Sequence, residues 1–227
     1  MPRRIRKHAN PFSVRVALGQ LDRQATFGRE APLEVEIGSG AGKFLWARAL
    51  ANPDRDFVGL EVRDPLVEGL MARPDRPPNL VYLFANANQN LALAEPGVIR
   101  MFHVHFPDPC FKARHYKRRV LQPGVVRTMA ALLPLGGQIY VQSDVRLLAE
   151  EMYRFLAAEH ALEGRLDPHM RVDAPVPEQT EWEQHHRAVG EPIWRMLFEK
   201  VREPTGPIPA LECGPVRRLE DERASQA

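Results

Sequence analysis

Short apolar or alternating segments recur along residues 33–201, and helix-like segments separate most of them. Residues 33–37 (LEVEI) alternate between apolar and acidic side chains, as expected of a strand. Residues 98–106 (VIRMFHVHF) are apolar on both faces, which is typical of a central strand. The same reading predicts further strands at 56–61, 79–85, 137–143 and 193–201.

Apolar periodicity predicts helices between these strands. They cover 44–50, 64–73, 123–133, where Pro123 suits the first turn, and 145–159. Strands that alternate with helices indicate an α/β fold with a mostly parallel central sheet and helices on both faces. Ligands of such sheets bind beyond the carboxyl ends of the strands.

Length and charge predict one domain with two flanking segments. The chain has 227 residues, enough for one domain with a sizeable core. Residues 1–31 are predicted to form a basic arm, 32–202 the domain, and 203–227 a Pro-rich, charged tail. The net charge of +2 excludes a bulk polycation, so any nucleic-acid site must be a local cluster.

Several classes of protein are disfavoured. No apolar run approaches ~20 residues, so no membrane span is predicted. Cys110 and Cys213 form no CxxC pair, which argues against a disulfide framework or a zinc site and favours a cytoplasmic protein. His103 and His105 point to one face of the fourth strand without a third ligand, so we interpret them as packed strand residues and predict no metal.

A glycine loop follows the first strand. Gly38, Gly40 and Gly42 allow a tight turn and a close approach of the backbone to a ligand. Their G-x-G-x-G spacing differs from the G-x-G-x-x-G of dinucleotide sites. Glu36, two residues before the loop, would repel a pyrophosphate but attract the ammonium and sulfonium of S-adenosylmethionine.

Two later strand ends support the same cofactor. Glu61 closes the second strand about 20 residues after the loop, where an acid accepts hydrogen bonds from ribose hydroxyls. Asn86, after the third strand, is positioned to read the adenine edge. These residues favour S-adenosylmethionine over the cofactor of an NAD oxidoreductase.

The loop after the fourth strand runs Phe106-Pro107-Asp108-Pro109-Cys110. Its prolines predict extended conformations at Phe106 and Asp108, and a stiff loop can hold one carboxylate over a pocket. Residues 112–119 then include five basic residues out of eight, interleaved with His115 and Tyr116. Such a run suits phosphate contacts and base stacking in RNA, although a plain solvated face is the ordinary alternative.

These motifs together resemble the tRNA (guanine-N7)-methyltransferases of the TrmB type. The resemblance covers roughly residues 33–200 and rests on the order of Glu36-Ile37-Gly38, the loop from Phe106 to Pro109 with its basic run, Gln142-Ser143-Asp144, and Thr180-Glu181-Trp182-Glu183. It implies a Rossmann-like class I methyltransferase fold, S-adenosylmethionine as the cofactor and tRNA as the partner.

The resemblance also implies roles for individual residues. The cofactor would be bound by Glu36, Gly38, Gly40, Gly42, Glu61, Asn86 and Asp108. Asp108 would also be the catalytic carboxylate, which orients a guanine of the variable loop for methylation at N7. The substrate would be bound by Lys112, Arg114, His115, Tyr116, Lys117, Arg118, Arg119, Asp144, Thr180, Glu181, Trp182 and Glu183.

Two departures from the family pattern leave alternatives open. Cys110 stands where the family usually has Trp, and Asn86 where it often has Asp. Pro109-Cys110 is similar to the Pro-Cys nucleophile of cytosine-C5 methyltransferases, although a basic run follows it. A non-catalytic RNA-binding subunit of the same fold is the other alternative. The sequence does not determine the oligomeric state.

Overall fold

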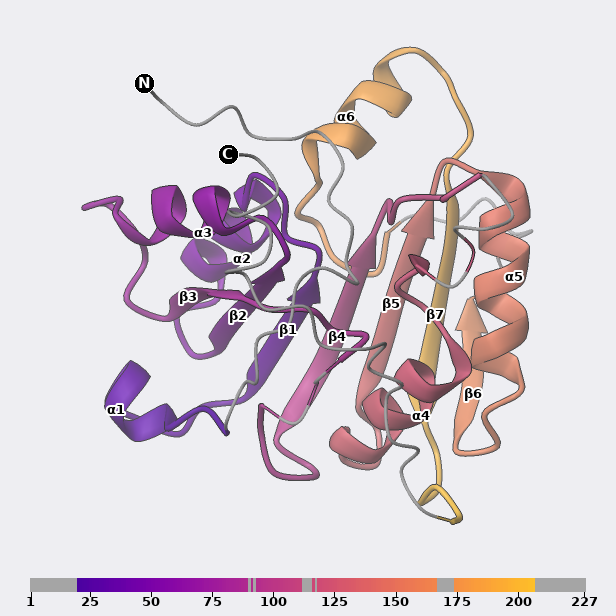
Figure 1. Ribbon diagram of the computed structural model, residues 1–227, viewed down its shortest axis with the longest axis horizontal. Helices are drawn as coiled ribbons and strands as arrows, with labels where there is room; N and C mark the ends of the chain where they lie inside the picture. The colour runs from indigo at the N-terminus through magenta and orange to yellow at the C-terminus, as the bar shows by residue number, and fades with distance from the viewer. Residues whose placement is uncertain are drawn as a thin grey trace, which may run out of the picture.

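The computed structural model describes residues 20–89, 91, 93–111, 116, 118–166 and 174–206. Within them, a seven-stranded sheet has the order β3-β2-β1-β4-β5-β7-β6 (Figure 1). The strands are β1 (Leu33–Ile37), β2 (Asp56–Glu61), β3 (Leu80–Phe84), β4 (Ile99–His105), β5 (Gln138–Ser143), β6 (Leu162–Leu166) and β7 (Trp194–Lys200). The helices are α1 (Arg23–Phe27), α2 (Lys43–Ala51), α3 (Asp64–Met71), α4 (Pro123–Leu132), α5 (Arg146–Ala157) and α6 (Glu181–Ala188).

The predicted α/β fold with a mostly parallel sheet is confirmed. Strands β1 to β5 pair in parallel, whereas β7 is antiparallel to both β5 and β6. The chain leaves β1 towards β2 on one side and returns as β4 on the other. The order therefore reverses between β1 and β4, where the carboxyl ends of open α/β sheets bind their ligands.

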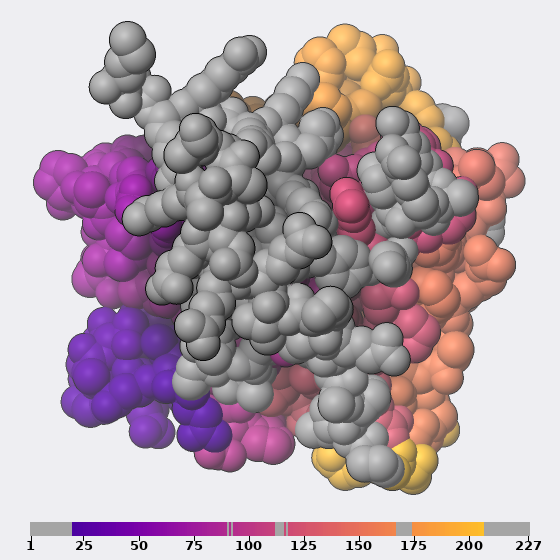
Figure 2. Space-filling view, in the orientation of Figure 1, coloured from indigo at the N-terminus to yellow at the C-terminus, as the bar shows by residue number. Residues whose placement is uncertain are grey.

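Helices cover both faces of the sheet (Figure 1). The apolar residues of β1 pack in a core with α4 and α5, whereas α2 and α3 pack against the other face. The two acidic residues of β1, Glu34 and Glu36, are buried as well, and alternation places them opposite the apolar ones. In Figure 2 the N-terminal elements, in indigo and purple, and the C-terminal ones, in orange and yellow, occupy opposite sides of the face shown.

The strands and helices predicted from the pattern are confirmed to within two residues at each end. The pattern missed β6, an edge strand in which only Leu162 is buried, so its sequence carries no clear alternation. It also missed α1, which has no buried residue. Residues 20–31, predicted as part of the arm, include α1 and lie against the domain, where Arg29 pairs with the buried Asp56 at 2.9 Å.

Candidate active site at the carboxyl edge of the sheet

The acidic and amide residues predicted from the sequence follow successive parallel strands. Glu36 lies in β1, Glu61 ends β2, and Asn86, Asp108 and Asp144 come shortly after β3, β4 and β5. Parallel strands present their carboxyl ends at one edge of the sheet. The topology thus brings all five residues to that edge.

The glycine loop turns tightly between β1 and α2. Gly38, Gly40 and Gly42 have φ angles of 83, 55 and 75°, in the left-handed region that favours glycine. A Cβ on Gly42 would lie 2.7 Å from the Tyr82 hydroxyl and 2.9 Å from Leu70, so this position needs space as well as its φ angle. The Tyr82 hydroxyl donates to the Gly42 carbonyl over 2.7 Å and fixes the start of α2.

Contacts with β2 hold the loop in place. The backbone N–H groups of Gly38 and Ser39 both donate to the Leu60 carbonyl, at 2.8 and 3.1 Å. Gly59, which the sequence analysis did not single out, makes this approach possible. A Cβ there would lie 2.4 Å from the Ser39 Oγ and 2.5 Å from the Tyr82 ring. A glycine inside a strand often marks such a close approach, so the signal was present in the sequence.

Glu61 is buried and organises the same loop. Its Oε2 accepts a hydrogen bond from the Gly40 N–H at 2.8 Å. The Arg63 guanidinium donates to both carboxylate oxygens, from Nε at 2.9 Å and from Nη2 at 3.0 Å. These hydrogen bonds to Glu61 raise the pKa of Arg63. Arg63 is a further polar residue of this edge that the sequence analysis missed, although it is the first cation after the predicted strand.

Glu36 and Asn86 are both buried, at 3% and 2% exposure. The Glu36 Oε1 lies 2.9 Å from His105 Nδ1. Its Oε2 has no hydrogen-bond partner among the described residues. The Asn86 Oδ1 accepts a hydrogen bond from the Asn88 N–H at 3.0 Å and so holds the turn after β3.

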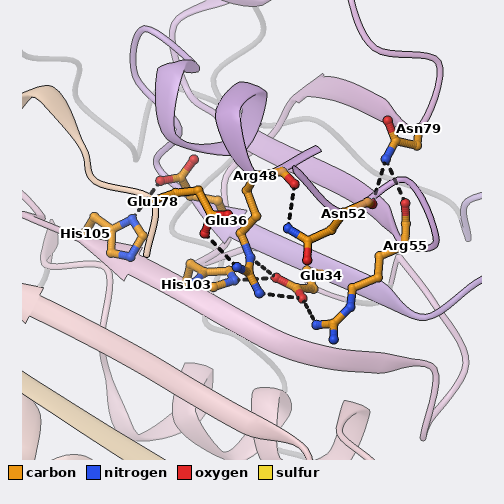
Figure 3. A network of polar contacts seen from close by, with 9 residues as sticks. All are labelled: Glu34, Glu36, Arg48, Asn52, Arg55, Asn79, His103, His105 and Glu178. Atoms are coloured by element: carbon orange, nitrogen blue, oxygen red, sulfur yellow. Dashed lines mark hydrogen bonds and ion pairs between the residues drawn. The ribbon is translucent and has the colours of Figure 1, made fainter. Parts of the chain in front are cut away.

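A buried polar network lies behind Glu36 (Figure 3). Glu34 accepts hydrogen bonds from Arg48, Arg55 and His103, and Arg48 also pairs with Glu178. Burial opposes ionisation of Glu34, but the bonds from His103 and Arg48 outweigh it and hold the pKa of that carboxyl well below its usual range. Burial lowers the pKa of His103 to about 4. The network joins β1, α2, β4 and the segment before α6, and it confirms that His103 is a packed strand residue.

The loop after β4 departs from the prediction at Phe106. Phe106 does not take the expected extended conformation, because its φ angle is 46°. Non-glycine residues in this region cost of order 1–3 kcal/mol each. The Phe106 N–H donates to the Gln142 carbonyl at 2.8 Å, and its ring stacks on His186 with centroids 6.0 Å apart. These tertiary contacts outweigh the local preference of a residue before proline.

Asp108 lies exposed in this loop. Its Oδ1 accepts a hydrogen bond from the Cys110 N–H at 2.9 Å, which ties the carboxylate to the turn. Cys110 is half-buried and has a φ angle of 46°. Burial, and then the charge of Asp108, raise the pKa of the Cys110 thiol. A nucleophilic cysteine needs the opposite shift, because the thiolate is the reactive form.

Part of the predicted basic run lies outside the described residues, namely Lys112, Arg114, His115 and Lys117. Tyr116 is 48% exposed, whereas Arg119 is buried. The Arg119 Nε donates to the Pro109 carbonyl at 2.8 Å, and its Nη1 pairs with Glu151 of α5. Its guanidinium also lies 4.1 Å from the centre of the Tyr116 ring. Arg119 thus links the Asp108 loop to the domain, whereas Arg118 is only half-buried.

The predicted Thr180–Glu183 segment begins α6. Thr180 caps the helix, since its Oγ1 accepts from the Glu183 N–H at 3.0 Å. The Glu183 carboxylate is buried against Arg195 and Gln142, at 2.6 and 3.2 Å. Both residues therefore hold the local fold.

The other two residues of that segment lie at the surface. Glu181 pairs with Lys43 at the start of α2. Trp182 is 52% exposed, and its Nε1 donates to the Asp144 Oδ2 at 3.0 Å. The same oxygen lies 3.4 Å from His186 Nε2. Asp144 does not cap α5, whose N-cap is Val145.

The chain is similar to one described family and to relatives named tRNA (guanine-N(7)-)-methyltransferase. The family described as "Putative methyltransferase" matches residues 30–196. The tRNA (guanine-N(7)-)-methyltransferase of Synechococcus elongatus is 37% identical over 214 residues, which cover 88% of this chain and 97% of that protein. The enzyme of the same name from Trichormus variabilis is 35% identical, over 87% of this chain and 96% of its own.

Solved structures with the same fold are more distant in sequence. The aminoglycoside resistance methyltransferase NpmB1 has a TM-score of 0.59 at 16% identity, over 82% of this chain and 95% of its own. The 16S rRNA methyltransferase KamB has a TM-score of 0.57 at 19% identity, over 83% and 96%. These similarities show a Rossmann-like class I methyltransferase fold, as the resemblance implied. Among the described residues, no helix is long and apolar enough to span a bilayer.

Proposed function

The chain belongs to the tRNA (guanine-N(7)-)-methyltransferase family, and we propose that it methylates N7 of a guanine in the tRNA variable loop, using S-adenosylmethionine. The observation that carries this proposal is the gathering of Glu36, Glu61, Asp108 and Asp144 at one edge of the sheet, beside the glycine loop. The reaction takes place in the cytoplasm under this proposal.

The chemistry of the buried acceptors supports this cofactor. Glu36 presents a buried oxygen without a hydrogen-bond partner among the described residues, and the methionyl ammonium needs an acceptor. A pyrophosphate at the same place would be repelled. Glu61 supplies the acid that accepts bonds from ribose hydroxyls. The proposed cofactor-binding residues are Glu36, Gly38, Gly40, Gly42, Glu61, Asn86 and Asp108.

The proposed reaction requires little acid–base chemistry. When bound, S-adenosylmethionine supplies a methyl group on a positively charged sulfur. Guanine N7 has a free lone pair at neutral pH, so no proton must be removed before it attacks, and catalysis is mostly positioning. Asp108 orients the guanine by accepting hydrogen bonds from N1 and N2 of the base. Its negative charge also stabilises the positive charge that the ring gains as N7 becomes methylated.

The tRNA contacts follow from the exposed side of the same edge. Tyr116 offers a half-exposed ring for base stacking. Arg118, with Lys112, Arg114, His115 and Lys117 of the basic run, would contact phosphates. Asp144 and Trp182, joined by a 3.0 Å hydrogen bond, would anchor the base or its ribose. Arg119, Thr180, Glu181 and Glu183 would act through the segments they hold.

The test is methyl transfer from labelled S-adenosylmethionine to unmodified tRNA, with nucleoside analysis of the product by mass spectrometry. A matched tRNA carries adenine in place of the variable-loop guanine. We expect 7-methylguanosine that disappears with the matched tRNA. A 5-methylcytidine product would favour Cys110 as a nucleophile. If the protein forms no methylated product and binds no cofactor, the result favours the non-catalytic RNA-binding alternative.

A further inference from the structure

Two glutamate–histidine pairs lie side by side between β1 and β4 (Figure 3). His103 Nε2 lies 2.9 Å from Glu34 Oε2, and His105 Nδ1 lies 2.9 Å from Glu36 Oε1. In strand register Glu34 faces Met101 and Glu36 faces His103, so each glutamate bonds the histidine two residues further along. The two glutamates, two residues apart on β1, therefore bond two histidines with the same spacing on β4.

The two pairs differ in how far their hydrogen bonds are satisfied. Both oxygens of Glu34 are bonded, because Arg48 and Arg55 donate to it in addition to His103. Glu36, in contrast, has a buried Oε2 without a hydrogen-bond partner among the described residues, and the same holds for His105 Nε2. The carboxylate of the deeper pair is thus fully bonded, although His103 Nδ1 has no hydrogen-bond partner among the described residues. The carboxylate beside the glycine loop keeps one oxygen unbonded among these residues.

Packing fixes the orientation of the His105 ring. The ring meets Phe44 of α2 edge to face, with centroids 4.3 Å apart, and Tyr140 of β5 at 5.3 Å. An ionised carboxylate can only accept, so the bond to Glu36 places a hydrogen on His105 Nδ1. The hydrogen bond in turn fixes the Glu36 carboxylate, with Oε1 occupied and Oε2 left as an acceptor.

We propose that His105 is a positioning residue, which holds Glu36 so that its Oε2 accepts a hydrogen bond from the methionyl ammonium of the cofactor. This inference rests on the proposed function. In the neutral imidazole a hydrogen on Nδ1 leaves Nε2 as an acceptor, so both unpartnered atoms of the pair, Glu36 Oε2 and His105 Nε2, then accept. The pair therefore requires a hydrogen-bond donor, and an ammonium supplies donors together with the opposite charge.

Three substitutions of His105 separate the donor from the packing. In H105N the amide nitrogen lies near the place of Nδ1 and keeps the donor. In H105Q it lies near the place of Nε2, so a polar group remains but the donor is displaced. H105F keeps a ring and removes both nitrogens. H103Q is the matched control, because Gln keeps a donor at the Nε2 position that His103 uses towards Glu34.

The readout is calorimetric affinity for two ligands that differ at the methionyl end. S-adenosylhomocysteine carries the ammonium, whereas 5′-methylthioadenosine has the same adenosine and thioether without it. We expect H105Q and H105F to weaken S-adenosylhomocysteine binding by roughly ten- to a hundredfold, the loss typical of a hydrogen bond to a charged group. Binding of 5′-methylthioadenosine should change less than about twofold, because its contacts do not depend on Glu36.

The conservative variants complete the test. H105N should keep most of the affinity for S-adenosylhomocysteine, and H103Q should leave the ratio of the two affinities unchanged. The double variant E36Q/H105Q should bind S-adenosylhomocysteine only slightly more weakly than either single variant, since both substitutions act on one contact.

The remaining outcomes contradict either the positioning role of His105 or the proposed cofactor. If H105Q lowers the affinity for both ligands equally, or lowers neither affinity, the positioning role of His105 is contradicted. Failure of the unchanged protein to bind either ligand would contradict the proposed cofactor instead.

Discussion

On the β1–β2 side of the sheet edge Glu36 and Glu61 are buried and hydrogen-bonded within the fold, whereas on the β4–β5 side Asp108 and Trp182 lie exposed on a loop and at a helix start. Glu61 bonds the N–H of the glycine loop, and Glu36 is fixed by His105. Asp108 and Trp182 are exposed. The first side is built like a core, and the second depends on a few side chains that hold its loops in place.

This difference fits the two molecules of the proposed reaction. A small cofactor is recognised by a few buried groups with fixed directions. An RNA is held mostly at its phosphates and by stacking, which need exposed cations and rings.

Removing the charge of Asp108 should have the largest effect. We expect D108N to lower kcat by roughly 10²–10³-fold at saturating cofactor and tRNA, because under the proposed mechanism the carboxylate stabilises charge that forms only in the reaction. Thermal unfolding should be unchanged, since Asp108 is exposed. D54N, at another exposed carboxylate, is the control and should leave both quantities unchanged. Near-full turnover in D108N would refute the catalytic role.

Adding one methyl group to the glycine loop should affect the buried side. We expect G42A to lower the free energy of unfolding by about 2–4 kcal/mol, through the left-handed φ angle and the clash with Tyr82 and Leu70. Cofactor affinity should fall with it. G136A is the control: its φ angle is 77° but nothing lies within 4 Å of the added Cβ, so only the smaller conformational cost remains. Equal losses of unfolding free energy would show that packing at Gly42 is unimportant.

The contrast between Arg119 and Arg118 tests what holds the exposed side. We expect R119M to lower kcat by roughly tenfold and to lower the melting temperature, because the loop of Asp108 loses its link to Glu151. R118M should instead raise the KM for tRNA and reduce the salt dependence of binding by about one unit of slope. Titration of tRNA at several salt concentrations distinguishes them, and identical behaviour of the two variants would contradict this division.

The smallest effect is expected at Cys110. We expect C110S to keep activity within about twofold, because burial and Asp108 raise the pKa of its thiol and so oppose a nucleophilic role. The same methyl-transfer assay measures it, with C110A as a second variant. A complete loss in both variants, together with a 5-methylcytidine product in the unchanged protein, would support the cytosine-C5 alternative.

The sequence determined the order and type of nearly all the core elements. Alternation in β1 and periodicity in α5 depend on which side chains must leave water, so they are visible without the fold. The strand ends were therefore predictable, and with them the edge at which Glu36, Glu61 and Asp108 gather. The edge strand β6 and the short α1 were not predicted, because few of their side chains are buried.

The contacts of each polar residue, in contrast, depend on the tertiary fold. Arg119 stands in a run of cations, yet its guanidinium is buried between Pro109 and Glu151. Phe106 takes a left-handed φ angle that its own sequence disfavours, because His186 and Gln142 lie beside it only in the fold. His105 meets Glu36 across 69 residues of chain. Such pairings bring together distant segments, and hydrogen bonds act over about 3 Å, so local sequence cannot specify them.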